Sequence, residues 1–144
     1  MSMKTFRAIV DELGDTLITA VLYGWGEPFL HKDLPEMIKV CTRRNILTAT
    51  STNGNSIQTI EDALNIVDSG LTGLIIAVDG SNQEIYGNYR KSGDFEQAIK
   101  SILLIEEAKK IRRSNFPYTN LRFVVMYISF PSAHRVLGWN GNWV

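Results

Sequence analysis

Residues 16–37, TLITAVLYGWGEPFLHKDLPEM, decide the fold. The segment opens with nearly continuous apolar sequence rich in β-branched side chains, which is typical of a parallel strand covered on both faces. Gly24 and Gly26 follow, with Glu27 and a proline directly after them. Glycines let backbone groups approach a ligand closely, and ligands of α/β proteins bind beyond the carboxyl ends of strands. This turn is therefore a candidate binding loop, although an isolated glycine turn is common between elements of any function.

The same order of strand, polar turn and helix repeats along the chain. Further strands are expected at 46–50, at 74–78 and at 121–128, and the first two run into STNG at 51–54 and Asp79-Gly80. Helices separate the strands, and one more helix precedes the first strand. Crossovers of this length imply βαβ units. We predict an α/β fold with a parallel sheet of about four strands, either open or curved into a partial TIM-barrel-like arc.

The expected helices each have an apolar face at helical spacing. Capping boxes are expected at two of them, Asp33 with Glu36 and Asp94 with Gln97, and Gly14 and Gly70 are expected to end helices. The residues predicted to face inward are Phe6, Ile9, Val10 and Leu13; Leu34, Met37, Ile38 and Cys41; Ile57, Ile60, Leu64 and Val67; and Phe95, Ile99, Ile102 and Leu103.

The overall charge points to no particular class of macromolecular partner. Lys plus Arg number 15 and Asp plus Glu number 15, so no net field attracts the chain to nucleic acid or to an acidic membrane surface. No apolar stretch is long enough to span a bilayer, and the first residues lack a signal-peptide pattern. We expect a cytoplasmic protein that binds neither nucleic acid nor membrane.

The sequence contains a single cysteine, Cys41. One cysteine allows no intrachain disulfide and no metal site built from several thiolates of this chain. Cys41 falls on the apolar face of its expected helix, which favours a buried structural thiol over a reactive or metal-binding one.

Four motifs occur in order, each at the end of an expected strand or in the loop after it: GWGEPFLHKDL, STNG, VDG and NYRKSGDFEQAIKSI. With these motifs the chain resembles the radical S-adenosylmethionine enzymes, particularly those with a SPASM-type auxiliary domain, from Met1 to about Met126. The resemblance implies part of a (β/α)6 barrel. In that family a Cys-x-x-x-Cys-x-x-Cys loop holds a 4Fe–4S cluster, at which S-adenosylmethionine is cleaved to a deoxyadenosyl radical.

The resemblance also implies a set of cofactor-binding residues. Gly24, Gly26 and Glu27 match the turn whose backbone receives the methionine amino group, with Trp25 at a variable position. Ala77 occupies a position that often carries a hydroxyl. The remaining matches are Ser51, Thr52 and Asn53 of the next turn, Asp79 after the third strand, and Arg90, which can pair with the cofactor carboxylate.

The three-cysteine loop of the family is missing from this sequence. Without its thiolates we expect no cluster site and no catalysis by this chain alone. We interpret residues 1–128 as a partial radical S-adenosylmethionine core, β/α units 2 to 5, and residues 129–144 as an irregular tail. Truncation or a frameshift explains this pattern most economically. An incomplete sheet also predicts self-association through its exposed edges.

Two alternative functions remain open from the residues. The first is a non-catalytic module that binds a nucleoside or a partner. The second, a phosphate-binding enzyme, is disfavoured because Glu27 would repel a phosphate. Tyr86 and Tyr89 could stack on adenine or pack against the rim. The remaining candidates are interpreted as non-catalytic: a solvated loop histidine, His31, beside Asp33, and a solvated basic helix end formed by Lys109, Lys110, Arg112 and Arg113.

Overall fold

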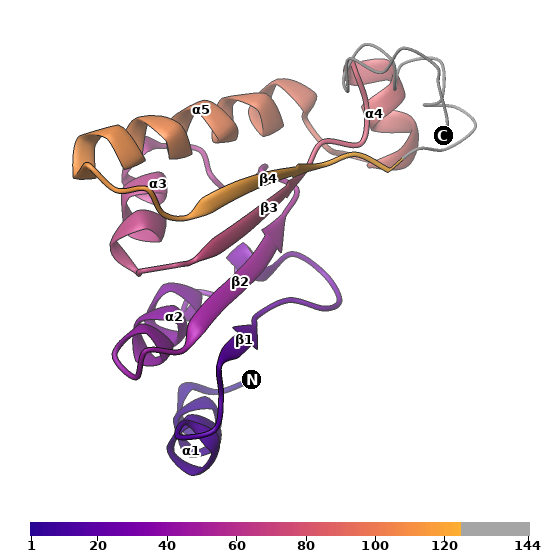
Figure 1. Ribbon diagram of the computed structural model, residues 1–144. Coiled ribbons are helices and arrows are strands. Elements are labelled where there is room, and N and C mark those ends of the chain that lie inside the picture. Colours follow the sequence, from indigo (N-terminus) through magenta and orange to yellow (C-terminus); the bar gives the residue numbers. More distant parts are fainter. Residues whose placement is uncertain (125–144) are drawn as a thin grey trace, which may run out of the picture.

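The computed structural model describes residues 1–124, which form one parallel sheet with helices (Figure 1). The elements in chain order are α1 (Met3–Leu13), β1 (Thr19–Val21), the 3-10 turn η1 (Pro28–Leu30), α2 (Leu34–Thr42), β2 (Leu47–Thr52), α3 (Ile60–Asp68), β3 (Gly73–Ala77), α4 (Gln83–Tyr89), α5 (Phe95–Arg112) and β4 (Tyr118–Arg122). The predicted strand over 121–128 is therefore misplaced: β4 begins at Tyr118 and ends at Arg122, so the two share only Leu121 and Arg122. Residues 125–128 of the prediction and the predicted tail 129–144 lie outside the described residues.

The sheet has the order β1-β2-β3-β4, and all three pairings are parallel. Thr19 pairs with Leu47 in the first ladder and Ser51 with Ile75 in the second. Each crossover passes through helical sequence, so every strand points the same way and the polar turns gather at one edge. The predicted α/β fold is confirmed.

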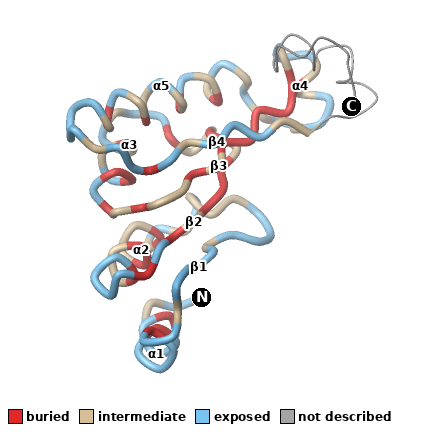
Figure 2. The backbone as a smooth tube through the Cα atoms, in the orientation of Figure 1, coloured by how far each residue is buried: buried red, intermediate tan, exposed pale blue. Residues whose placement is uncertain are grey.

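Helices α1, α2, α3 and α5 lie on one face of the sheet, whereas the opposite face carries no helix among residues 1–124 (Figure 1). On this open face Val21 is 59% exposed and Leu47 49% exposed, and in β1 only the middle residue, Ala20, is not exposed (Figure 2). The prediction that residues 16–23 form a strand covered on both faces is wrong. The strand is short, lies at the edge of the sheet and is covered on one side.

Two apolar clusters hold the helices to the sheet. The larger one joins α2, α3 and α5 to β3: Leu34, Ile38, Ile57, Ala63, Ile66, Val67, Leu71, Leu74, Ile76, Val78, Ile105 and Ala108. The smaller one docks α1 on α2: Phe6, Val10, Met37, Cys41 and Ile46. The predicted inward face of α2 is confirmed, but Ile9 and Leu13 of α1 are largely exposed, because α1 packs on α2 through a narrow stripe.

The buried face of α5 is shifted from the one predicted: Phe95, Ile99 and Ile102 do pack against the larger cluster, but only at its margin. Its buried residues are Ala98, Ser101, Ile105 and Ala108, whereas Leu103 is 65% exposed. Small side chains on the buried face allow α5 to approach the layer beneath it closely. A prediction that follows the largest apolar residues misses such a face, because alanine and serine carry little hydrophobic signal.

At the N-terminus of α2 the predicted cap is wrong, and at the N-terminus of α5 it is confirmed. Asp33 makes no side-chain capping bond; its backbone N–H instead donates to His31 Nδ1 at 3.2 Å. The predicted Asp33–Glu36 capping box is therefore wrong, because Asp33 has ψ near 0° rather than the extended backbone of an N-cap. The predicted N-cap at Asp94 is confirmed, since its carboxylate accepts from Gln97 N at 3.0 Å. The reciprocal bond of a capping box does not form, because Asp94 N donates to Asn55 Oδ1 at 2.8 Å.

Helix α4 was not expected, because its sequence, QEIYGNY, is mostly polar and contains a glycine. Asn82 caps it by accepting a hydrogen bond from Ile85 N at 3.0 Å. Within residues 1–124, none of the helices combines the length and the apolar character needed to cross a membrane.

The corrected face of α5 predicts which of two nearby substitutions destabilises the chain. Ile105→Ala removes a fully buried side chain and should lower the free energy of unfolding by about 2–5 kcal/mol. Leu103→Ala, on the exposed side of the same helix, should change it by less than about 0.5 kcal/mol. Urea unfolding followed by circular dichroism measures both, and equal losses would contradict the assigned face.

Candidate functional site

The turns after β1 and β2 and the ends of β3, α4 and β4 meet around a small polar cavity at the carboxyl edge of the sheet. Its volume is about 110 Å³. All of the predicted binding residues except Asp79 line it: Gly24, Gly26, Glu27, Ser51, Thr52, Asn53 and Arg90. Tyr23, Pro28, Ala77 and Arg122 complete the wall. Parallel strand order is what brings these distant segments to one edge.

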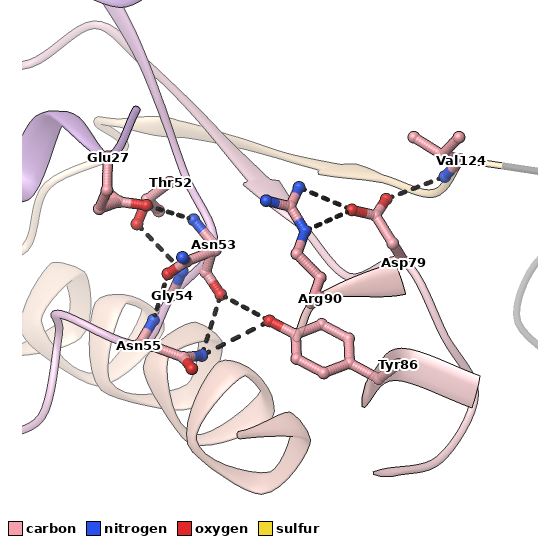
Figure 3. Close-up of polar contacts among 9 residues, drawn as sticks. All are labelled: Glu27, Thr52, Asn53, Gly54, Asn55, Asp79, Tyr86, Arg90 and Val124. Atoms are coloured by element: carbon pink, nitrogen blue, oxygen red, sulfur yellow. Dashed lines mark hydrogen bonds and ion pairs between the residues drawn. The ribbon is translucent and has the colours of Figure 1, made fainter. Parts of the chain in front are cut away.

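Glu27 joins the first turn to the second. Its Oε1 accepts a hydrogen bond from Phe29 N at 3.3 Å, and its Oε2 accepts one from Asn53 N at 2.8 Å (Figure 3). Gly26 makes the preceding bend possible with a φ of +85°. The carboxylate thus fixes the spacing of the two turns while one of its edges still lines the cavity.

The turn after β2 is stiffened by its own side chains. Thr52 Oγ1 accepts from Gly54 N at 3.0 Å, and Asn53 Oδ1 accepts from Asn55 N at 2.9 Å. At Gly54 a Cβ would lie 2.5 Å from Ser101 Oγ on α5, so this position requires glycine. Ser51 is buried, with 7% of the residue exposed, yet its hydroxyl has no hydrogen-bond partner within residues 1–124. Ser51 is therefore the side chain of this turn that is free to serve a ligand.

Asn55 and Tyr86 support the site, and the sequence analysis did not find their role. Asn55 Oδ1 accepts from Asp94 N at 2.8 Å, and Asn55 Nδ2 donates to Asp94 O at 3.0 Å. The Tyr86 hydroxyl donates to Asn53 O at 3.3 Å. Tyr86 is fully buried and packs edge-to-face on Phe95, and burial raises its pKa. Of the two alternatives for Tyr86, packing is the one observed.

Asp79 and Arg90 form an ion pair behind the cavity wall. Asp79 Oδ2 accepts from Arg90 Nε at 2.8 Å and lies 2.7 Å from Arg90 Nη2. Asp79 Oδ1 accepts from Val124 N at 3.0 Å. Asp79 is fully buried. Arg90 Nη1 points away from Asp79 (Figure 3) and has no acceptor among residues 1–124, so it can still donate to a ligand.

Arg122 at the end of β4 is a cavity residue that the sequence analysis missed. It pairs in register with Ala77 of β3, which lines the same cavity. No signal in the sequence marked it, because the predicted strand over 121–128 put Arg122 near the start of a strand, whereas β4 ends there.

The other candidates lie outside this cavity. Arg112 pairs with Asp68 through bonds of 2.7 and 2.8 Å, which raise the Arg112 pKa, and Lys109 pairs with Glu106 at 2.9 Å. His31 Nε2 lies 3.0 Å from Met1 O. The basic residues therefore lie at the carboxyl end of α5, and His31, at the end of η1, contacts Met1.

Comparison with known proteins places this geometry in context. A family described as the Radical SAM superfamily matches residues 1–127. The AdoMet-dependent heme synthase of Oleidesulfovibrio alaskensis is 26% identical over 82% of this chain and 32% of its own length. Mycofactocin maturase MftC of Mycolicibacterium smegmatis is 30% identical over 71% of this chain and 26% of its own length. The chain thus spans about a third or less of the length of these relatives.

A solved structure shows the same fold. The crystal structure of archaeal TYW1 superposes with a TM-score of 0.53 at 19% identity, over 92% of this chain and 46% of that one. At this identity the likeness concerns the fold alone, and it supports the predicted barrel-like arrangement of the sheet.

The Glu27 bridge predicts local loosening in a Glu27→Gln variant. The substituted amide keeps one oxygen and presents an NH₂ group to either Phe29 N or Asn53 N, so one of these hydrogen bonds is lost. We expect a loss of about 1–3 kcal/mol and faster amide hydrogen exchange at Asn53. Glu61→Gln makes the same change at an exposed carboxylate that has no side-chain hydrogen bond among residues 1–124, and it serves as control. Unchanged exchange at Asn53 would show that the bridge does not hold the turn.

The burial of Cys41 predicts how stability varies with pH. Cys41 is fully buried and burial raises the pKa of its thiol, so the folded chain keeps a proton that the unfolded chain loses above about pH 8.5. The contribution of the Cys41 thiol to the free energy of unfolding is fully present below that pH, and it declines as the pH rises toward the folded-state pKa. Urea unfolding at pH 7.5 and 9.5 should show a larger decline for the unsubstituted chain than for Cys41→Ala. Equal declines would contradict it.

Proposed function

Because the chain belongs to the radical S-adenosylmethionine superfamily, we propose that its cavity holds the amino-acid end of S-adenosylmethionine. Members of the superfamily cleave this cofactor to begin radical chemistry. The cofactor residues are Gly24, Gly26, Glu27, Ser51, Thr52, Asn53 and Arg90, whereas Asp79 acts through Arg90. The observation that carries the proposal is the convergence of three successive strand ends on one small cavity that contains both signs of charge.

The charges around the cavity suit a zwitterion. The Glu27 carboxylate lies on one part of the wall and the Arg90 guanidinium on another. An α-amino acid group presents an ammonium and a carboxylate a short distance apart, so it can satisfy both. A phosphate would meet the negative charge of Glu27 without compensation, which disfavours the phosphate-binding alternative.

The glycine turn supplies the approach surface. A Cβ at Gly24 or at Gly26 would meet no atom within 4 Å, so the absence of side chains here is not required by internal packing. Exposed backbone amides and carbonyls therefore remain accessible to the ligand. Ser51 adds a hydroxyl from the neighbouring turn.

The donor set of this chain does not fit the 4Fe–4S cluster of the family. Such clusters are held by several cysteine thiolates, but the sequence has one cysteine, and it is fully buried between α1 and α2. We therefore propose that this chain binds S-adenosylmethionine without a cluster of its own and does not cleave it alone. The non-catalytic binding alternative thus describes the same site.

The remaining assignments follow from the family. We propose a SPASM-type relative in which residues 1–128 belong to β/α units 2 to 5 of the core; the predicted tail 129–144 lies outside the described residues. The edges β1 and β4 are the surfaces for self-association, since Val21 and Leu121 are exposed there. Named relatives include a heme synthase and a mycofactocin maturase, so the proposal concerns the cofactor and leaves the substrate unassigned.

Calorimetric titration of the full 144-residue chain with S-adenosylmethionine tests the proposal. We expect saturable binding by the unsubstituted chain. Gly24→Ala should weaken it about tenfold or more, because the added methyl group enters a cavity of about 110 Å³ without disturbing internal packing.

Gly87→Ala is the matched control. Gly87 lies within α4, where alanine is favoured over glycine, and it does not line the cavity. Binding should be retained in this variant. Absence of binding by a folded unsubstituted chain, or equal affinities for all three proteins, would refute the placement of the cofactor at this turn.

A further inference from the structure

Arg122 is a charged residue for which the described structure provides no counter-charge. Its side chain lines the same small cavity as Arg90, yet it makes no hydrogen bond or ion pair with any residue of 1–124. Arg90, in contrast, is held by the buried carboxylate of Asp79. Of the two guanidinium groups at the cavity, Arg122 is therefore the one that is not neutralised.

The sheet geometry directs Arg122 toward the ligand. Arg122 pairs with Ala77, and alternation along the strands places both on the open face of the sheet, together with Ser51. Ala77 is 1% exposed and carries no polar atom, so its methyl group leaves room beside it and offers no hydrogen bond. Beside Ala77, strand β4 supplies the long side chain of Arg122, which has five N–H donors.

The other charges at the cavity do not compensate Arg122. Glu27 is the carboxylate among the described lining residues, and both of its oxygens already accept backbone N–H groups. The cavity therefore has positive charge in excess on its Arg90 and Arg122 side. A planar guanidinium favours a carboxylate, to which it can present two parallel N–H groups.

We propose that Arg122 is a second carboxylate-binding residue, which together with Arg90 Nη1 selects a ligand that carries an α-carboxylate. The proposal rests on the proposed binding of S-adenosylmethionine at this cavity and extends it to a residue outside the four motifs. It assigns to β4 a direct role in recognition, in addition to the turns after β1 and β2.

The test compares S-adenosylmethionine with its decarboxylated form, which keeps the nucleoside, the sulfonium and the amine. Each ligand is titrated calorimetrically into the full chain and into Arg122→Gln. The unsubstituted chain should prefer the carboxylated ligand. In Arg122→Gln, affinity for S-adenosylmethionine should fall about tenfold or more, whereas affinity for the decarboxylated ligand should change less than about twofold. Arg122→Lys should keep part of the preference because it retains the charge.

Arg43→Gln is the matched control, because Arg43 is an exposed arginine at the end of α2 whose contact with Glu36 is long, at 3.4 Å. It should bind both ligands as the unsubstituted chain does. Circular dichroism establishes that each variant is folded, and Arg122 is exposed enough for replacement.

The outcomes separate the two proposals. If the chain binds S-adenosylmethionine and Arg122→Gln keeps the full preference for the carboxylated ligand, the role of Arg122 is overturned and the cofactor site stands. Equal weakening for both ligands would also overturn it, because that result indicates a structural role. If the folded unsubstituted chain binds neither ligand, the cofactor site itself fails, and the role of Arg122 fails with it.

Discussion

The buried carboxylate of Asp79 is the constraint on which the carboxyl edge of the sheet depends. A fully buried charge must be compensated, and here three N–H groups from two segments meet it: Arg90 Nε and Nη2, and Val124 N. These contacts tie the segment after β3 to the end of α4 and to Val124, the second residue after β4. It therefore fixes Arg90 against the cavity wall while leaving one nitrogen for other use.

A second carboxylate works in the same way on the other side of the cavity. Glu27 bridges the turns after β1 and β2 by accepting backbone N–H groups from both. Acidic residues in a ligand loop are often interpreted as ligand contacts, but the main task of Glu27 and Asp79 is to hold segments together. The surfaces left for a ligand are glycine backbone, the Ser51 hydroxyl, the guanidinium groups of Arg90 and Arg122, and the lone pairs of the Glu27 carboxylate that accept no backbone N–H group.

The sequence predicted those features that depend on local chemistry. The alternation of apolar runs and helices was enough to predict the parallel sheet. The order of the polar turns was enough to predict that Glu27 and Asn53 lie at the same edge. It failed where tertiary contacts decide. Leu103 was expected inside, but small residues let α5 pack closely through another face. Helix α4 was missed because Tyr86 is the one buried residue of a mostly polar helix, and Arg122 enters the site through strand register, which no local pattern contains.

The cavity and the cluster site of the family use different parts of the sequence. This chain can therefore have the cavity without the thiolates that hold a cluster. Every contact that shapes the cavity is a hydrogen bond, an ion pair or a glycine approach among residues 23–124, and none involves a thiol. The single cysteine lies in a cluster with Phe6, Val10, Met37 and Ile46, where it acts as a small apolar side chain. The proposed recognition of an amino-acid end would use strand ends in register, glycine backbone and guanidinium groups at the cavity, and none of these depends on a thiol.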